Sequence, residues 1–233
     1  GTTLISALQA GHNAVGFEIN PYAALACRVK IEAFSLDLPQ LDQAITEYDY
    51  ASRNGSQTAV GAIPPGFASR IPFFSPQVEE QVHGFFSFLD RVVPQPLVDL
   101  FKVAFGAVMV GFSNYTYEPS LSTRPGAGKP LIEQADVHAA VLAKLRKIRS
   151  DIAWLQSRRT SSDAPQGVVH LMSFMEAGRV LEPQCVDLAV TSPPYLNNYH
   201  YVRNTRPHLY WLGLMDSPND LQGIEQNNIG KFW

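Results

Sequence analysis

The stretch that decides the fold is GTTLISALQAGHNAVGFEINPYAALACRVKIEAF, residues 1–34. Apolar side chains recur at helical spacing over residues 3–10, and Gly11 is suited to end that helix. Residues 14–19 form a short, mostly apolar run that predicts a strand. Residues 23–34 return to helical spacing after an Asn-Pro pair of the kind that begins a helix. The order helix, strand, helix predicts the second part of a βαβα unit whose first strand precedes the quoted stretch.

A second apolar run lies near the other end of the chain, at residues 186–191. Its continuous pattern is typical of a strand buried on both faces of a parallel sheet. Residues 168–172 predict another strand, and residues 174–181 a short helix or turn. The two ends of the chain therefore predict an α/β domain.

The middle of the chain does not alternate in this way. Glycine, serine and proline predict loops at residues 53–69 and 115–130. Helices are predicted at residues 38–50, 76–93, 97–112 and 131–159. Basic side chains gather in the later half of the last helix, against the single acid Asp151: Lys144, Arg146, Lys147, Arg149, Arg158 and Arg159. The α/β domain is thus predicted to be split by a largely helical insertion.

Composition sets limits on the class of protein. Of the 233 residues, 45% are hydrophobic and 17% are charged, which suits a packed globular chain. The net charge of −3 supplies no overall basic field, so a nucleic acid would have to be held by local patches. Cys27 and Cys185 form no CxxC pair, and His200 and His208 lack a third ligand, so we expect no metal site. Without a leader or a long apolar span, a cytoplasmic location is expected.

The run at residues 186–191 leads into the sequence Thr-Ser-Pro-Pro-Tyr. A strand of a parallel sheet delivers such a turn to the carboxyl edge, where open α/β folds bind ligands. Pro193 and Pro194 have a fixed φ and no N–H group, so their carbonyl oxygens become rigid acceptors. Ser192 adds a hydroxyl, and Tyr195 a flat face for stacking. Together these groups suit a planar ligand that bears an exocyclic amine.

The motif TSPPY resembles the catalytic motif of S-adenosylmethionine-dependent DNA amino-methyltransferases, (Asp, Asn or Ser)-Pro-Pro-(Tyr or Phe). The opening GTTL…GFEINP resembles the end of that family's cofactor motif, F-x-G-x-G-T-T, followed by an acid at the end of the next strand. The resemblance implies a Rossmann-like methyltransferase fold with a helical insertion. It implies that S-adenosylmethionine binds beside Gly1, Thr2, Thr3, Glu18 and Asn20, with Glu18 on the ribose.

The resemblance also implies a reaction. A DNA base flips out of the duplex and stacks on Tyr195, while Ser192 and the carbonyl of Pro193 accept hydrogen bonds from its amino group. Serine at the first motif position favours N4 of cytosine over N6 of adenine. The segment LNNYHYVR and the later WLG resemble a subset of site-specific DNA methyltransferases, which suggests that Asn198 or Arg203 contacts the target or its phosphates.

The order of the motifs predicts three parts of the chain. Residues 1–36 would bind the cofactor, residues 37–166 could form a target-recognition region, and residues 167–233 would carry the catalytic motif. The basic helix at residues 144–159 is a candidate DNA-facing surface, although a solvated helix face has the same pattern. A restriction endonuclease could be a partner, and no membrane partner is expected. The abrupt ends of the sequence suggest a piece of a longer protein.

Two other classes of function remain open at this point. Related Pro-Pro-Tyr motifs also serve methyltransferases that act on RNA bases or on protein amides. A catalytically inactive fragment that serves as a binding module would carry the same residues.

Overall fold

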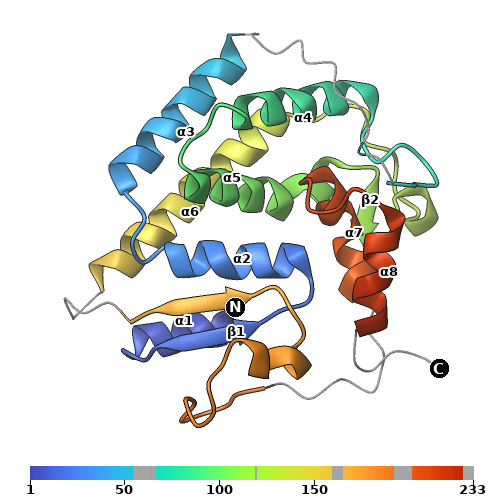
Figure 1. Ribbon diagram of the computed structural model, residues 1–233. Coiled ribbons are helices and arrows are strands. Elements are labelled where there is room, and N and C mark those ends of the chain that lie inside the picture. Colours follow the sequence, from blue (N-terminus) through green and yellow to red (C-terminus); the bar gives the residue numbers. More distant parts are fainter. Residues whose placement is uncertain (55–63, 65–66, 119, 159–164, 192–200, 228–233) are drawn as a thin grey trace. The chain divides into compact units, whose positions relative to one another are not determined.

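The computed structural model describes residues 1–54, 64, 67–118, 120–158, 165–191 and 201–227 (Figure 1). The chain divides into two compact units, one formed by Gly1–Ile31 with Arg159–Trp233 and the other by Glu32–Arg158. The described part is mostly helical and contains a small parallel sheet. The mixed α/β character is therefore confirmed. The Rossmann-like arrangement and the functional division of the chain stay predictions.

The first unit contains the predicted order of helix, strand and helix. These elements are α1 (Thr2–Gln9), β1 (Ala14–Phe17) and α2 (Pro21–Glu32). The second predicted strand is also present as β4 (Gly167–His170), and it lies beside β1 in Figure 1. The two strands pair in parallel, with Ala14 opposite Gly167.

Two glycines let both helices approach this small sheet closely. A Cβ atom at Gly16 would lie 2.9 Å from Leu4 Cδ1 of α1. A Cβ atom at Gly167 would lie 2.9 Å both from Leu8 Cδ1 of α1 and from Ile31 Cγ2 of α2. Leu8 thus packs where the strands begin and Leu4 packs farther along β1. Because α1 runs opposite to β1, its N-terminus faces the carboxyl edge of the sheet.

The strand predicted at residues 186–191 is absent. That segment has no strand assignment, and the exposed fractions of Val186, Leu188 and Val190 are 53%, 77% and 64%. An apolar run becomes a buried strand only where neighbouring strands pair with it. Within the described residues of this unit, β1 pairs only with β4, so the run has no strand beside it. The prediction of a doubly buried strand was wrong.

The other assigned elements of the first unit are helices. The 3-10 helix η3 (Phe174–Arg179) confirms the short helix or turn predicted there, and Ser173 caps it by accepting a hydrogen bond from the backbone N–H of Met175 at 3.3 Å. Two further helices are α7 (Tyr201–Trp211) and α8 (Pro218–Asn227). The Tyr210 hydroxyl donates to the carbonyl of Ser217 at 3.2 Å, which ties α7 to the start of α8.

The second unit is built from the predicted helices. They are α3 (Leu38–Arg53), α4 (Pro76–Leu89), α5 (Gln95–Val108) and α6 (Val137–Ser157). Helix α6 begins later than predicted because Asp136 caps it, accepting from the N–H of Ala139 at 2.7 Å. It packs against the other three helices.

The core of this unit is aromatic. Phe85 and Phe105 are at most 1% exposed, and their rings stack with centroids 4.7 Å apart. The segment Gln95–Phe112, which joins α5 to the 3-10 helix η1 (Met109–Phe112), is by length and composition apolar enough to cross a membrane. Half of it is buried inside the unit, and the buried core helix of a soluble protein can be equally long and apolar.

The predicted loop at residues 115–130 is partly ordered as a hairpin. Its strands β2 (Tyr115–Tyr117) and β3 (Leu121–Thr123) pair antiparallel, and the 3-10 helix η2 (Pro125–Ala127) follows. Strands of three residues are too short to give a periodic signal, which explains the wrong prediction. Most of the loop predicted at residues 53–69 lies outside the described residues.

Candidate functional site

The carboxyl ends of β1 and β4 lie at the same edge of the sheet because the strands are parallel. Glu18 is the first residue beyond β1, and its backbone N–H donates to the carbonyl of His170 at 3.0 Å. Its carboxylate oxygen Oε1 accepts from the backbone N–H of Asn20 at 2.9 Å. These two bonds hold a half-buried carboxylate at the edge where open α/β sheets bind ligands.

Asn20 has an internal role at this edge. It is 6% exposed, and its Oδ1 accepts from the backbone N–H groups of Tyr22 at 3.0 Å and Ala23 at 3.3 Å, which caps α2. Its Nδ2 donates to the hydroxyl of Thr205 on α7 at 2.7 Å. The amide therefore joins the start of α2 to α7. Contact between Asn20 and a cofactor stays a prediction.

A ring contact reinforces this junction. The ring centroids of Tyr22 on α2 and His208 on α7 are 4.3 Å apart, and His208 is 4% exposed. The sequence did not single out Tyr22 or Thr205. The cap formed by Asn20 could be predicted from its local Asn-Pro sequence, whereas no local pattern marks Thr205, which lies 185 positions away. Helix α7 is thus fixed to the segment that follows Glu18.

The three residues at the start of the chain are exposed at the N-terminus of α1. The first backbone N–H groups of a helix have no acceptor within the helix, so they can donate to a ligand. A Cβ atom at Gly1 would lie 3.1 Å from Cys27 Sγ on α2. Glycine therefore allows the start of α1 to lie close to α2. Gly1, Thr2 and Thr3 and the carboxylate of Glu18 belong to the same unit and the same sheet edge.

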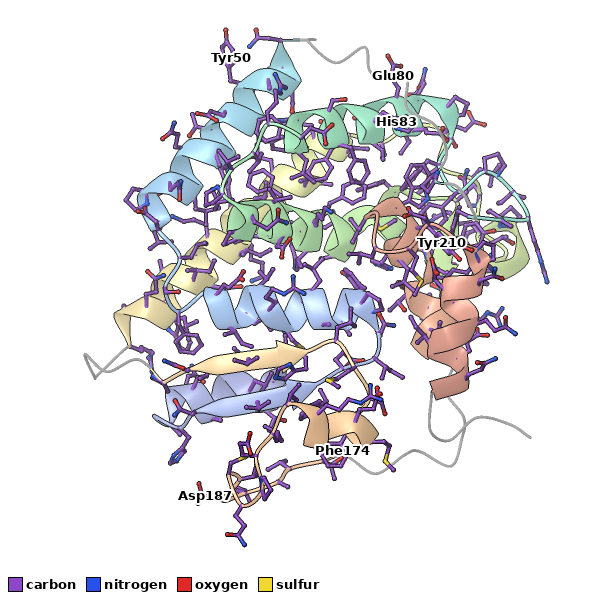
Figure 2. The ribbon with its side chains drawn as sticks, in the orientation of Figure 1. Tyr50, Glu80, His83, Phe174, Asp187 and Tyr210 are labelled. Atoms are coloured by element: carbon purple, nitrogen blue, oxygen red, sulfur yellow. The ribbon has the colours of Figure 1, made fainter. Side chains whose placement is uncertain are left out.

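Of the other predicted site residues, the structure describes only Arg203. Ser192, Pro193, Pro194, Tyr195 and Asn198 lie outside the described residues. Arg203 is exposed on α7. Beyond β4, Phe174 is 68% exposed, and Asp187 is also exposed and points away from the two strands (Figure 2). Among the described residues, no group of three or more His, Cys, Asp or Glu side chains could hold a metal ion.

The sequence of this chain is similar to that of a known methyltransferase. The chain is 23% identical over 234 residues to the type II methyltransferase M.BsoBI of Geobacillus stearothermophilus, in an alignment that covers 92% of this chain. The chain is a distant relative of a type II methyltransferase. It spans 45% of the length of that relative. No family model and no solved structure matches the chain.

The junction at Asn20 leads to a prediction about stability. Thr205→Val keeps the size of the side chain but removes the hydroxyl, so the buried amide of Asn20 loses its acceptor. We expect the free energy of unfolding to fall by about 1 to 3 kcal/mol, the cost of an unsatisfied buried donor. Chemical denaturation monitored by circular dichroism measures the change. Thr205→Ser, which keeps the hydroxyl, serves as the control; equal losses in both variants would contradict a role for the hydrogen bond.

Proposed function

We propose that this chain is part of an S-adenosylmethionine-dependent DNA methyltransferase that methylates an exocyclic amino group of a base, N4 of cytosine in preference to N6 of adenine. Support comes from the two motifs and from the similarity to a type II methyltransferase over 92% of the chain. The observation that carries the proposal is the position of Glu18. Its carboxylate is held at the carboxyl edge of the parallel sheet, where the N-terminus of α1 also lies.

The residues at this edge fit the cofactor. Bound S-adenosylmethionine supplies an electrophilic methyl group on a positively charged sulfur. The Oε1 atom of Glu18 accepts from Asn20, and its second oxygen has no hydrogen bond to another described residue. That oxygen can accept from a ribose hydroxyl, as acids at strand ends do in dinucleotide-binding folds. The small residues Gly1 to Thr3 let the cofactor approach the backbone of α1.

The motif at residues 192–195 supplies the groups that act on the base. Ser192 and the carbonyl of Pro193 accept hydrogen bonds from the amino group, which localises the nitrogen lone pair for attack on the methyl carbon. Pro194 stiffens the turn, and Tyr195 stacks on the flipped ring. With S-adenosylmethionine bound, the new carbon–nitrogen bond would form as the bond from the methyl carbon to sulfur breaks, and Ser192 would accept a hydrogen bond from the amino group, which releases one proton to solvent. Catalysis rests on positioning and electrostatics.

The remaining parts of the proposal concern the whole protein. Residues 1–36 bind the cofactor, residues 37–166 take part in recognition of the target sequence, and residues 167–233 carry the catalytic motif. Asn198 and Arg203 contact the target or its phosphates. A restriction endonuclease that cleaves the unmethylated sequence is the partner, and the location is cytoplasmic. The chain spans 45% of the length of its relative.

A comparison of acceptors tests the proposed function. The 233-residue chain is incubated with S-adenosylmethionine labelled in the methyl group and, in separate reactions, with mixed-sequence duplex DNA, RNA and protein. We expect label in the DNA alone. Label confined to RNA or to protein would contradict the proposal in favour of another amine or amide acceptor. Binding of DNA without any transfer of label would identify a binding module.

A further inference from the structure

One face of α6 carries a line of solvent-accessible side chains that we call the α6 stripe, in which Lys144 is half-buried and the other four side chains are exposed. Its spacing alternates between three and four positions, which places all five side chains on the same side of a helix. Helix α6 spans Val137–Ser157, and Arg158 forms its C-terminal cap. The stripe consists of Lys144, Lys147, Asp151, Trp154 and Arg158.

Another side of α6 is anchored in the core of the second unit. Val141 and Leu145 are 0% exposed and Ile152 is 4% exposed. Burial of large aliphatic side chains stabilises a fold, so this side of the helix is firmly held. The stripe is therefore presented to solvent by a fixed helix.

The other basic residues of α6 have structural partners. The guanidinium of Arg149 donates twice to Asp42 on α3, at 2.8 and 2.7 Å, and these hydrogen bonds hold the pKa of the Asp42 carboxyl below its ordinary value. Arg146 lies 3.4 Å from Asp49, also on α3. In contrast, Lys144 and Lys147 form no ion pair with any described residue. The basic residues of α6 thus fall into two groups, one tying α3 to α6 and one facing solvent.

The end of the stripe holds an arginine on an exposed ring. Trp154 is 54% exposed, and the Cζ atom of Arg158 lies 4.5 Å from the centroid of its ring. A guanidinium that lies over an aromatic face has its N–H donors in its own plane, so they remain available for a second partner. The planar fork of arginine matches the oxygens of a phosphate group. Arg158 thus places a positive charge beside an exposed ring at the end of the stripe.

We propose that the α6 stripe binds the sugar-phosphate backbone of duplex DNA, an inference that rests on the proposed function in taking DNA as the substrate. From Lys144 to Arg158 the helix rises about 21 Å, at ~1.5 Å per residue. One DNA strand presents a phosphate about every 3.4 Å along the axis, so three cations along this length can meet several phosphates. The stripe holds three cations and one acid in a chain of net charge −3. This local positive charge favours a polyanion over a second copy of the chain.

The salt dependence of DNA binding tests whether the α6 stripe contacts phosphates. Affinity of the 233-residue chain for a short mixed-sequence duplex is measured by fluorescence anisotropy across a range of salt concentrations. The variant Lys147→Ala with Arg158→Ala is compared with a control, Arg70→Ala with Arg91→Ala, which alters two exposed arginines of the same unit and the net charge by the same amount. Each phosphate contact contributes about 0.9 to the slope of log K against log salt. We expect the slope to fall by about 2 in the stripe variant and to stay unchanged in the control.

Several results would contradict the proposal that the α6 stripe binds DNA. Equal slopes in the unsubstituted chain and the stripe variant, or equal losses in the stripe variant and the control, would show that these side chains do not contact phosphates. A stripe variant that changed only the sedimentation of the chain would identify a second copy as the occupant. Assay of methyl transfer to DNA in the same preparations separates the two proposals. Transfer together with an unchanged slope would refute the stripe and leave the proposed function standing.

Discussion

Replacement of Tyr195 by alanine is expected to lower the rate of methyl transfer to DNA about 100-fold or more, a loss typical of a substrate that is no longer held in position. The flipped base loses the ring on which it stacks, so its amino nitrogen spends less time in line with the methyl group. The affinity for S-adenosylmethionine should stay within about twofold, because the predicted cofactor contacts lie at Glu18 and at the start of α1.

Two measurements check the role of Tyr195. Single-turnover transfer of labelled methyl groups gives the rate, and isothermal titration calorimetry gives the affinity for the cofactor. Tyr195→Phe is the matched control, since phenylalanine keeps the aromatic face and occurs at this position of the family motif. We expect it to retain most of the activity. Parallel losses of rate and cofactor affinity in Tyr195→Ala would contradict the assignment of this residue to the base.

Replacement of Glu18 by alanine should have the complementary effect. Hydrogen bonds to a charged group contribute about 1.5 to 3 kcal/mol each. Because about 1.4 kcal/mol corresponds to a tenfold change in affinity, loss of the ribose contact should weaken S-adenosylmethionine binding about 10- to 100-fold. Affinity for duplex DNA should be unaffected, since the carboxylate has no assigned contact with the nucleic acid.

A matched variant controls for the change in charge. Glu182→Ala removes an exposed carboxylate from the same unit, and we expect the affinity for S-adenosylmethionine to stay the same. Calorimetry of both variants, together with thermal denaturation to show that the fold persists, gives the comparison. Wild-type affinity in a folded Glu18→Ala protein would exclude the proposed cofactor contact.

Local sequence signals predicted α1, β1, α2 and β4 of the first unit well, because each signal lay within or beside its element, whereas α7 and α8 were not predicted. The turn at Gly11 and the cap at Asn20 mark the ends of α1 and the start of α2, and both helices are present. The strand predicted at residues 186–191 was wrong, because an apolar composition shows only that the segment is hydrophobic. A buried strand also needs a neighbouring strand to pair with. The structure leaves Leu188 77% exposed. Pairing between distant segments is what a local pattern does not contain.

The same limit applies to the candidate site. The position of Glu18 after a strand could be predicted because strand and acid are adjacent in sequence. The bond between Asn20 and Thr205 could not, because its partners are far apart in the chain. On α6, sequence shows a cluster of basic residues but does not distinguish Arg149, which is paired with Asp42, from Lys147, which faces solvent. That distinction depends on how α3 packs beside α6.

The most direct test of the proposed activity is the identity of the methylated nucleoside. The 233-residue chain is incubated with methyl-labelled S-adenosylmethionine and mixed-sequence duplex DNA, and the DNA is digested and separated by chromatography. A duplex of adenine and thymine alone serves as the control, because it offers no cytosine. The proposal predicts label in N4-methylcytosine from the mixed duplex and none from the control. Label in neither N4-methylcytosine nor N6-methyladenine would contradict methyl transfer to a base amino group.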